Sequence, residues 1–266
     1  MEHRTTAGSG DPSPRSGSSE KRSSPIGLRT GSDSSDPIPI GRASGGTAKP
    51  RPKRRGGAAR RLFKFDRELG RRFVAGADEA GRGCLAGPLV AAGVLFDLER
   101  IGPSEVRALA GLNDSKQQLP EARAEVFPLI LRTAAKVVIV SRCAPGIDAR
   151  GLHVTNLAAL HDALRGVACP GCICLSDGFP VAELEHDQLA VIGGDAKSAA
   201  IAAASVIAKE TRDRYMRRAH VTHPGWEFAS HVGYSTPEHR DAIERIGVSP
   251  LHRRSFQSAA YQQLAL

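Results

Sequence analysis

GADEAGRG, residues 76–83, places two adjacent carboxylates between a strand-like apolar segment and a loop in which two glycines flank one arginine. Carboxylates that crowd into a cleft repel one another and raise each other's pKa. A site that keeps them ionised usually holds a divalent cation, and oxygen ligands favour Mg²⁺ or Mn²⁺. The Gly81-Arg82-Gly83 loop can bring backbone amides and a guanidinium up to a phosphate or a sugar. The stretch therefore predicts metal ions held against a nucleic-acid backbone.

Two later acids follow segments that are typical of short strands. Asp177 comes just after residues 173–175, and Asp195 follows residues 189–192 and a pair of glycines. Because ligands of open α/β sheets gather at strand ends, we expect both acids to join Asp78 and Glu79 in one site. A regular strand points neighbouring side chains to opposite faces. Both Asp78 and Glu79 can serve the site only if the strand is irregular there, which the nearby glycines allow.

The remaining pattern predicts an α/β domain with a mixed central β-sheet flanked by helices. Apolar and β-branched runs predict strands at 73–77, 87–96, 136–140, 173–175 and 189–192. Apolar residues at helical spacing, together with capping residues, predict helices at about 120–132, 152–164, 197–218 and 237–246.

Residues 1–61 differ in composition from the rest of the chain. They are rich in Gly, Ser and Pro and hold 13 Lys/Arg against 5 Asp/Glu, which accounts for +8 of the total formal charge of +9. Such a segment cannot bury enough apolar surface to offset the entropy of ordering, so we predict a disordered basic extension. It either attracts nucleic acid nonspecifically or is a solvated extension without that role. Residues 62–266 are predicted to form the catalytic domain.

Hydropathy and cysteine content indicate whether the protein spans a membrane and in which redox compartment it works. No apolar run reaches the roughly 18 residues that a membrane span needs, and the five cysteines suit a reducing cytoplasm better than a disulfide framework. Cys169-Pro170-Gly171-Cys172 is half of a possible zinc or redox motif, but no second half completes it. We favour a turn that holds small buried thiols.

Six motifs, in order, resemble one family, the prokaryotic ribonucleases HII. They are GADEAGRGCLAGP (76–88), LNDSKQQLP (112–120), CLSDG (174–178), GDAKSAAIAAASVIAKETRDRYM (194–216), HVGY (231–234) and GVSPLHRRSF (247–256). The resemblance implies a ribonuclease H-like fold with a helical C-terminal segment. It also implies an endonuclease that leaves a 5′-phosphate, hydrolyses the RNA strand of RNA–DNA hybrids, and nicks duplex DNA 5′ of a single embedded ribonucleotide.

The resemblance assigns roles to particular residues. The catalytic, metal-binding acids are Asp78, Glu79, Asp177 and Asp195, which would hold two Mg²⁺ or Mn²⁺ ions during catalysis. The residues that would bind substrate are Gly81, Arg82, Gly83, Lys116, Ser205, Lys209 and Tyr234. The Gly-Arg-Gly loop would sense the ribose 2′-hydroxyl, and the tyrosine would pack on the neighbouring sugar. Two plainer roles stay open, namely Tyr234 as a packing residue and Lys209 as a solvated helix charge.

Three positions depart from the family pattern. Val232 and Gln117 stand where a lysine is common, and Cys84 replaces a more usual proline after the Gly-Arg-Gly loop. We expect weaker duplex binding but an intact acid set. The alternatives are a ribonuclease HIII-like enzyme, which the Gly-Arg-Gly loop disfavours, and a catalytically silent RNA–DNA hybrid binding module. We expect a cytoplasmic monomer that binds nucleic acid and does not associate with a membrane. We expect it to act in DNA replication and repair.

Overall fold

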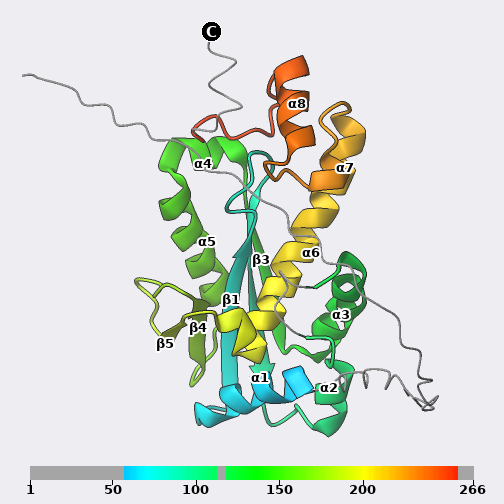
Figure 1. The fold of residues 1–266 in the computed structure, drawn as a ribbon. Helices are drawn as coiled ribbons and strands as arrows, with labels where there is room; N and C mark the ends of the chain where they lie inside the picture. The colour runs from blue at the N-terminus through cyan, green and yellow to red at the C-terminus, as the bar shows by residue number, and fades with distance from the viewer. Residues whose placement is uncertain (1–56, 113–117, 257–266) are drawn as a thin grey trace, which may run out of the picture. The chain divides into compact units, whose positions relative to one another are not determined.

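A five-stranded mixed sheet forms the centre of the domain (Figure 1). The computed structural model describes residues 57–112 and 118–256. The strands are β1 (Phe73–Ala80), β2 (Leu89–Asp97), β3 (Lys136–Arg142), β4 (Ile173–Asp177) and β5 (Asp187–Val191). Their order is β3-β2-β1-β4-β5, with antiparallel pairs β3–β2 and β2–β1 and parallel pairs β1–β4 and β4–β5. The predicted α/β class with a mixed sheet is confirmed.

Helices surround this sheet, and two of them decide the position of the site. The helices are α1 (Gly57–Glu68), α2 (Pro103–Ala108), α3 (Pro120–Thr133), α4 (Ala144–Arg150), α5 (Leu152–Val167), α6 (Ala199–Thr222), α7 (Phe228–His231) and α8 (Pro237–Ile246), with a 3-10 turn at Gly194–Ala196. Figure 1 shows α5 and α6 on opposite sides of the central strands. The short α7 and α8 form the predicted helical C-terminal segment.

The two faces of β1 follow the strand's period of two residues. Val74 packs in the same apolar cluster as the alanine-rich first half of α6, whereas Ala75 and Ala77 pack with α5. Asp78 therefore lies on the α6 face and Glu79 on the α5 face. The register β1–β2 continues without interruption to Ala80, so the strand is regular at Asp78 and Glu79 and the irregularity that the nearby glycines would allow is not present.

The α6 helix lies in direct backbone contact with β1 at Gly76. A Cβ atom added to Gly76 would come within 2.3 Å of the backbone carbon of Ala200. All ten residues at 199–208, in the first half of α6, are buried, and six of them are alanines. The small alanine side chains let the helix approach the strand closely, which brings the middle of α6 beside the end of β1.

The folded region begins earlier than predicted. We placed the boundary between residues 61 and 62, but α1 starts at Gly57, and Ala59 is completely buried in the core cluster beside Leu62 and Phe63. Its Asp66 accepts a hydrogen bond of 3.0 Å from the backbone N–H of Ala200, at the start of α6. Residues 57–61 therefore belong to the domain. The rest of the predicted extension lies outside the described residues.

The structure also describes the five cysteines and the hydropathy of the helices. All five cysteines are thiols, and Cys169-Pro170-Gly171-Cys172 forms a turn closed by a hydrogen bond of 3.1 Å between the Cys172 amide and the Cys169 carbonyl. Burial raises the pKa of the Cys169 and Cys174 thiols, which disfavours the reactive thiolate. Among the described residues, no helix has the length and apolar character to cross a membrane.

Candidate active site

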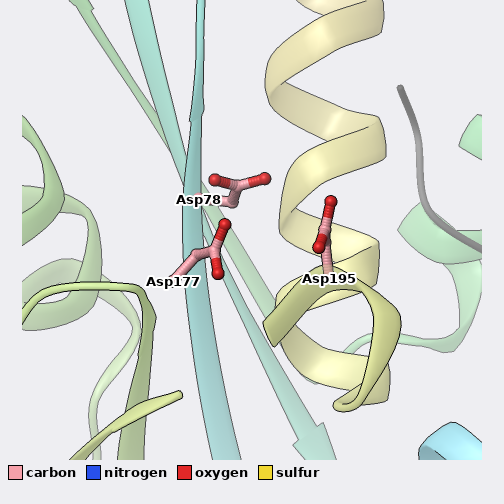
Figure 2. Close-up of side chains that lie close together, drawn as sticks. All are labelled: Asp78, Asp177 and Asp195. Carbon is pink, nitrogen blue, oxygen red and sulfur yellow. The ribbon is translucent and has the colours of Figure 1, made fainter. Parts of the chain in front are cut away.

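Three aspartates meet at the C-terminal ends of the central strands β1 and β4, beside the first half of α6 (Figure 2). Asp78 lies near the end of β1, Asp177 is the last residue of the neighbouring β4, and Asp195 lies in the 3-10 turn before α6. One carboxylate oxygen from each of the three lies within 4.8 Å of the others. The parallel pairing of β1 with β4 places the first two acids side by side. Asp195 enters from the helix side.

The environment of Asp78 penalises its negative charge. Burial, followed by the neighbouring charge of Glu79, raises the pKa of Asp78 to about 8, and Asp177 adds to the effect. A hydrogen bond with Ser205 of α6 opposes this shift. The Oδ1 atom accepts a hydrogen bond of 2.8 Å from the backbone N–H of Glu79, while Oδ2 is buried and has no hydrogen-bond partner. An orphaned carboxylate oxygen beside two other acids is suited to a cation.

A backbone hydrogen bond links Asp177 to the turn that carries Asp195. The Oδ1 atom of Asp177 accepts a hydrogen bond of 2.7 Å from the backbone N–H of Gly194. That bond ties the end of β4 to the turn that carries Asp195, a buried residue. The N-cap of α6 is Ser198, whose hydroxyl accepts from the Ile201 amide at 3.3 Å. Asp195 is thus not the N-cap of this helix.

Glu79 is not one of the three clustered acids. Because β1 stays regular to Ala80, the Glu79 side chain leaves the strand on the α5 face. It borders the same cleft and lies 3.7 Å from the guanidinium of Arg82. The structure therefore brings together three of the four predicted acids and places the fourth at the edge of the site.

The Gly-Arg-Gly loop uses its two glycines differently. Gly81 has a φ of +89°, and a Cβ there would lie 2.0 Å from Nε of Arg212. Gly83 does not have a φ in the left-handed region, and a Cβ there would meet no atom within 4 Å. Gly81 is therefore required by the fold. The open space at Gly83 is available to a ligand.

Two buried arginines donate hydrogen bonds to the backbone of the segment between β1 and β2, which contains this loop. Arg212 of α6 donates to the carbonyls of Ala86, Pro88 and Val232 at 2.8–2.9 Å. Arg253 donates to the carbonyls of Arg82 and Gly87 at 3.0–3.1 Å. Both arginines lie in motifs quoted above, but we did not predict their role. Buried side chains that bond to backbone leave no sequence signal beyond their residue type.

The predicted substrate-binding residues on α6 and at position 234 border the same cleft, whose volume is about 400 Å³. Tyr234 is 38% exposed, and Nζ of Lys209 lies 5.1 Å from the centre of its ring. Lys209 also donates a hydrogen bond of 2.7 Å to Asp213, so it is not a simply solvated charge. Ser205 lies one turn earlier and reaches Asp78. Lys116 and Gln117 lie outside the described residues.

Two buried histidines support the backbone of Tyr234. His252 accepts the Ser249 N–H at Nδ1 (2.8 Å), so its Nε2 carries the proton. That proton is donated to Nε2 of His239 across 3.1 Å, and His239 in turn donates from Nδ1 to the Tyr234 carbonyl at 2.8 Å. Both rings are neutral in this chain of bonds.

Two buried aspartates and one half-buried aspartate, with an orphaned oxygen and a neighbouring basic glycine loop at the ends of two central strands, are typical of a metal-dependent enzyme of the nuclease class. The all-oxygen donor set fits Mg²⁺ or Mn²⁺ and disfavours softer metals.

Comparison with known proteins identifies the family. The ribonuclease HII family model matches residues 75–259. The ribonuclease HII of Mycobacterium tuberculosis (strain ATCC 25618 / H37Rv) is 48% identical over 183 residues, which cover 69% of this chain and 67% of that protein. The chain therefore belongs to the ribonuclease HII family. It is a ribonuclease H that acts on RNA–DNA hybrids, and its family depends on divalent metal ions.

Solved structures agree with the fold. The ribonuclease H2 from Pyrococcus horikoshii OT3 matches with a TM-score of 0.62 and 27% identity, over 73% of this chain and 98% of that chain. A Bst-RNase HIII in complex with Mn²⁺ matches with a TM-score of 0.55 and 22% identity, over 84% of this chain and 77% of that chain. The ribonuclease H-like fold is confirmed; the second likeness concerns the fold alone.

Proposed function

We propose that this chain nicks duplex DNA on the 5′ side of a single embedded ribonucleotide, in addition to hydrolysing the RNA strand of hybrids, and that it uses two Mg²⁺ or Mn²⁺ ions. One observation carries the proposal. The orphaned Oδ2 of Asp78 lies in the three-aspartate group, and two members of this group, Asp78 and Asp177, line one cleft together with Gly83 and Tyr234. Carboxylates that can bind metal ions and residues that can contact a sugar thus line the same cleft.

The acids are assigned to the metal ions. Asp78, Asp177 and Asp195 would hold them, with Glu79 contributing from the edge of the cleft. When bound, two ions supply an activated water near neutral pH and neutralise the charge that grows on the phosphate. The protein contributes rigid placement of the carboxylates, because each is fixed by its strand or turn.

Substrate choice is assigned to the loop and the tyrosine. The absence of a side chain at Gly83 allows backbone groups to approach a ribose 2′-hydroxyl. Tyr234 presents an exposed aromatic face on which the adjacent deoxyribose can pack. Loop and tyrosine together would recognise the junction between one ribonucleotide and DNA. Arg82, Lys209 and Ser205 are assigned to the phosphate backbone in the same cleft.

We further propose that the chain acts as a monomer in the cytoplasm, with nucleic acid as its partner, and that it removes embedded ribonucleotides and RNA primers during DNA replication and repair. Light scattering of the purified full chain measures the oligomeric state. A stable dimer contradicts the proposed monomer and leaves the site assignment unaffected.

The deciding experiment uses the full chain and three labelled substrates: a duplex with one ribonucleotide, an all-DNA duplex of the same sequence, and an RNA–DNA hybrid. We expect a metal-dependent nick 5′ of the ribonucleotide and none in the all-DNA duplex. Absence of that nick while the hybrid is cut would contradict the proposed junction activity. Failure on all three substrates would favour the silent hybrid binding module. Cutting of the hybrid alone would favour ribonuclease HIII-like activity.

A further inference from the structure

Phe179 is an aromatic residue of the cleft that the sequence analysis did not single out. It lies two residues after Asp177 and is 40% exposed, and it borders the same cleft as Asp78 and Asp177. Its position is fixed by a tight turn at the end of β4. The Phe179 amide donates to the Asp177 carbonyl at 3.0 Å, and the Ser176 hydroxyl donates to the Phe179 carbonyl. The turn therefore keeps Phe179 at a fixed position close to Asp177, an acid assigned to catalysis.

The ring has contacts with two neighbouring side chains. The guanidinium carbon of Arg82 lies 5.4 Å from the centre of the ring, in cation–π geometry. The ring of His153 meets it edge-on at 6.0 Å. These contacts orient the ring but leave a large part of it open to the cleft. An exposed aromatic ring alone is ordinary on a protein surface. A rigidly held ring beside a catalytic acid is a better platform for a ligand.

The cleft thus contains two aromatic–cation pairs in different places. Tyr234 and Lys209 form one pair on the α6 side. Phe179 and Arg82 form the other, beside the end of β4. Among the described residues that line the cleft, these are the two with aromatic rings. A nucleic-acid strand bound in this cleft would therefore meet one aromatic ring on the α6 side and a second ring in the turn after β4.

We propose that Phe179 packs against a sugar of the cleaved strand, on the β4 side of the aspartates. The inference rests on the proposed function, in which Tyr234 packs on a sugar on the other side. A sugar is the suitable occupant because bases inside a duplex are paired and stacked, whereas sugars are exposed along the minor groove. Phe179 is thereby a substrate-contact residue, and the adjacent Arg82 meets the phosphate next to that sugar.

The test is steady-state kinetics of the full chain on an RNA–DNA hybrid and on the single-ribonucleotide duplex. We expect Phe179→Ala to raise KM about tenfold on both substrates with little change in kcat, since an aromatic contact to a nucleotide is lost. Phe179→Trp should stay within about twofold of wild type because it keeps a flat ring. Phe179→Leu keeps apolar bulk against His153 but has no flat face, and it should resemble the alanine variant. It serves as the second variant if Phe179→Ala fails to fold.

Tyr215 provides a matched control because it is 44% exposed on α6 and does not line the cleft. Tyr215→Ala should leave KM unchanged. A second control separates direct contact from orientation of Arg82. If Phe179 contacts the sugar, Phe179→Ala still raises KM in an Arg82→Ala background. Loss of the effect in that background overturns the inference, because Phe179 then acts only through the guanidinium.

The two substrates keep this inference separate from the proposed function. Wild-type KM on the hybrid for both Phe179→Ala and Phe179→Leu overturns the role of Phe179, whatever happens with the single-ribonucleotide duplex. A wild-type chain that cuts the hybrid but does not nick the single-ribonucleotide duplex overturns the proposed junction activity. In that case the effect of Phe179 on the hybrid still decides whether the ring contacts a sugar.

Discussion

The Nη1 atom of Arg253 donates a hydrogen bond of 3.0 Å to the backbone carbonyl of Arg82, a residue 171 positions earlier in the chain. The same buried guanidinium donates twice to the carbonyl of Gly87. The two ends of the loop that follows β1 are thus held by one side chain from the C-terminal segment. A planar fork with several donors is suited to this task, and an ammonium is not.

Arg253→Lys tests this arrangement. The ammonium keeps the charge but cannot reproduce the planar fork, so we expect the free energy of unfolding to fall by about 1–3 kcal/mol. We also expect nicking of the single-ribonucleotide duplex to fall more than cutting of the hybrid, because the loop is assigned to the ribose. Urea unfolding and activity on both substrates measure the two effects. Arg254→Lys, at the exposed neighbouring position, is the control. Equal losses in both variants would contradict the special role of Arg253.

The two loop glycines should behave differently. Gly83→Ala meets no atom within 4 Å, so its melting temperature should match wild type while its preference for a ribonucleotide over DNA falls. Gly81→Ala adds about 1–2 kcal/mol of backbone strain at positive φ, together with a clash against Arg212, and should lower the melting temperature. Thermal unfolding and the ratio of nicking rates separate fold from recognition. A Gly83→Ala enzyme with unchanged preference would remove this position from ribose recognition.

Replacing Asp78 should uncouple metal binding from stability. Asp78→Asn removes a buried carboxylate that Glu79 and Asp177 repel, so the metal-free protein should gain about 1–2 kcal/mol. Its stabilisation by added Mn²⁺ should largely disappear, and cleavage should be lost while hybrid binding persists. Calorimetry with and without Mn²⁺ measures the first two effects. Asp241→Asn, at an exposed position of α8, should leave the response to Mn²⁺ unchanged.

The buried histidine pair predicts a pH dependence. Burial lowers the pKa of His239 and of His252 from 6.5 to about 4. Between these values the unfolded chain binds protons that the folded chain does not, so each histidine destabilises the fold as pH falls from about 6.5 to 4. Asp66 and Asp78 have raised pKa values and act with the opposite sign in this range. The pH dependence of the free energy of unfolding of the wild-type protein therefore does not isolate the histidines.

A comparison with His239→Gln isolates the histidine contribution. From pH 7.5 to 4.5, wild type should lose about 2–3 kcal/mol relative to this variant, since one depressed histidine pKa is removed. Urea unfolding at several pH values measures the difference. A constant difference across this range would show that His239 titrates normally in the folded state.

Truncation tests the revised domain boundary. A chain that lacks residues 1–56 should keep its nicking activity, because every assigned site residue lies between Asp78 and Tyr234. Removal of residues 1–61 also takes away buried Ala59 and the first part of α1, and it should lower the melting temperature. Equal stability of the two truncated chains would return the boundary to residue 62. A dead chain after the shorter truncation would assign a catalytic role to residues 1–56.

The sequence predicted the sheet and most of the long elements because their apolar patterns are strong. The helix predicted at 237–246 matches α8. The helix α1 was not predicted at all, because Gly57, Arg60 and Arg61 give a polar composition and its buried face contains only a few apolar side chains. Such a short amphipathic helix is stabilised mainly by packing against the rest of the domain, and local composition does not reveal that packing.

The acids of the candidate site could be predicted because they follow strands. Side chains that bond only to backbone groups could not be predicted. Asp78, Asp177 and Asp195 converge as the strand ends predict. Glu79 does not join them, because the strand stays regular and its period of two decides the direction of each side chain. Arg253 was missed because its partners are carbonyls, which every residue has. Phe179 was missed because an aromatic after an Asp-Gly turn carries no pattern of its own.

The contact between Gly76 and Ala200 has a mechanical consequence. Strand and helix meet there through backbone atoms, with no flexible side chains between them to absorb a shift. Asp78 belongs to the strand and Ser205 to the helix, so the two sides of the site move as one stiff unit. Any adjustment needed to bring a scissile phosphate into place must then come from the nucleic acid, whose own deformability becomes part of the selection.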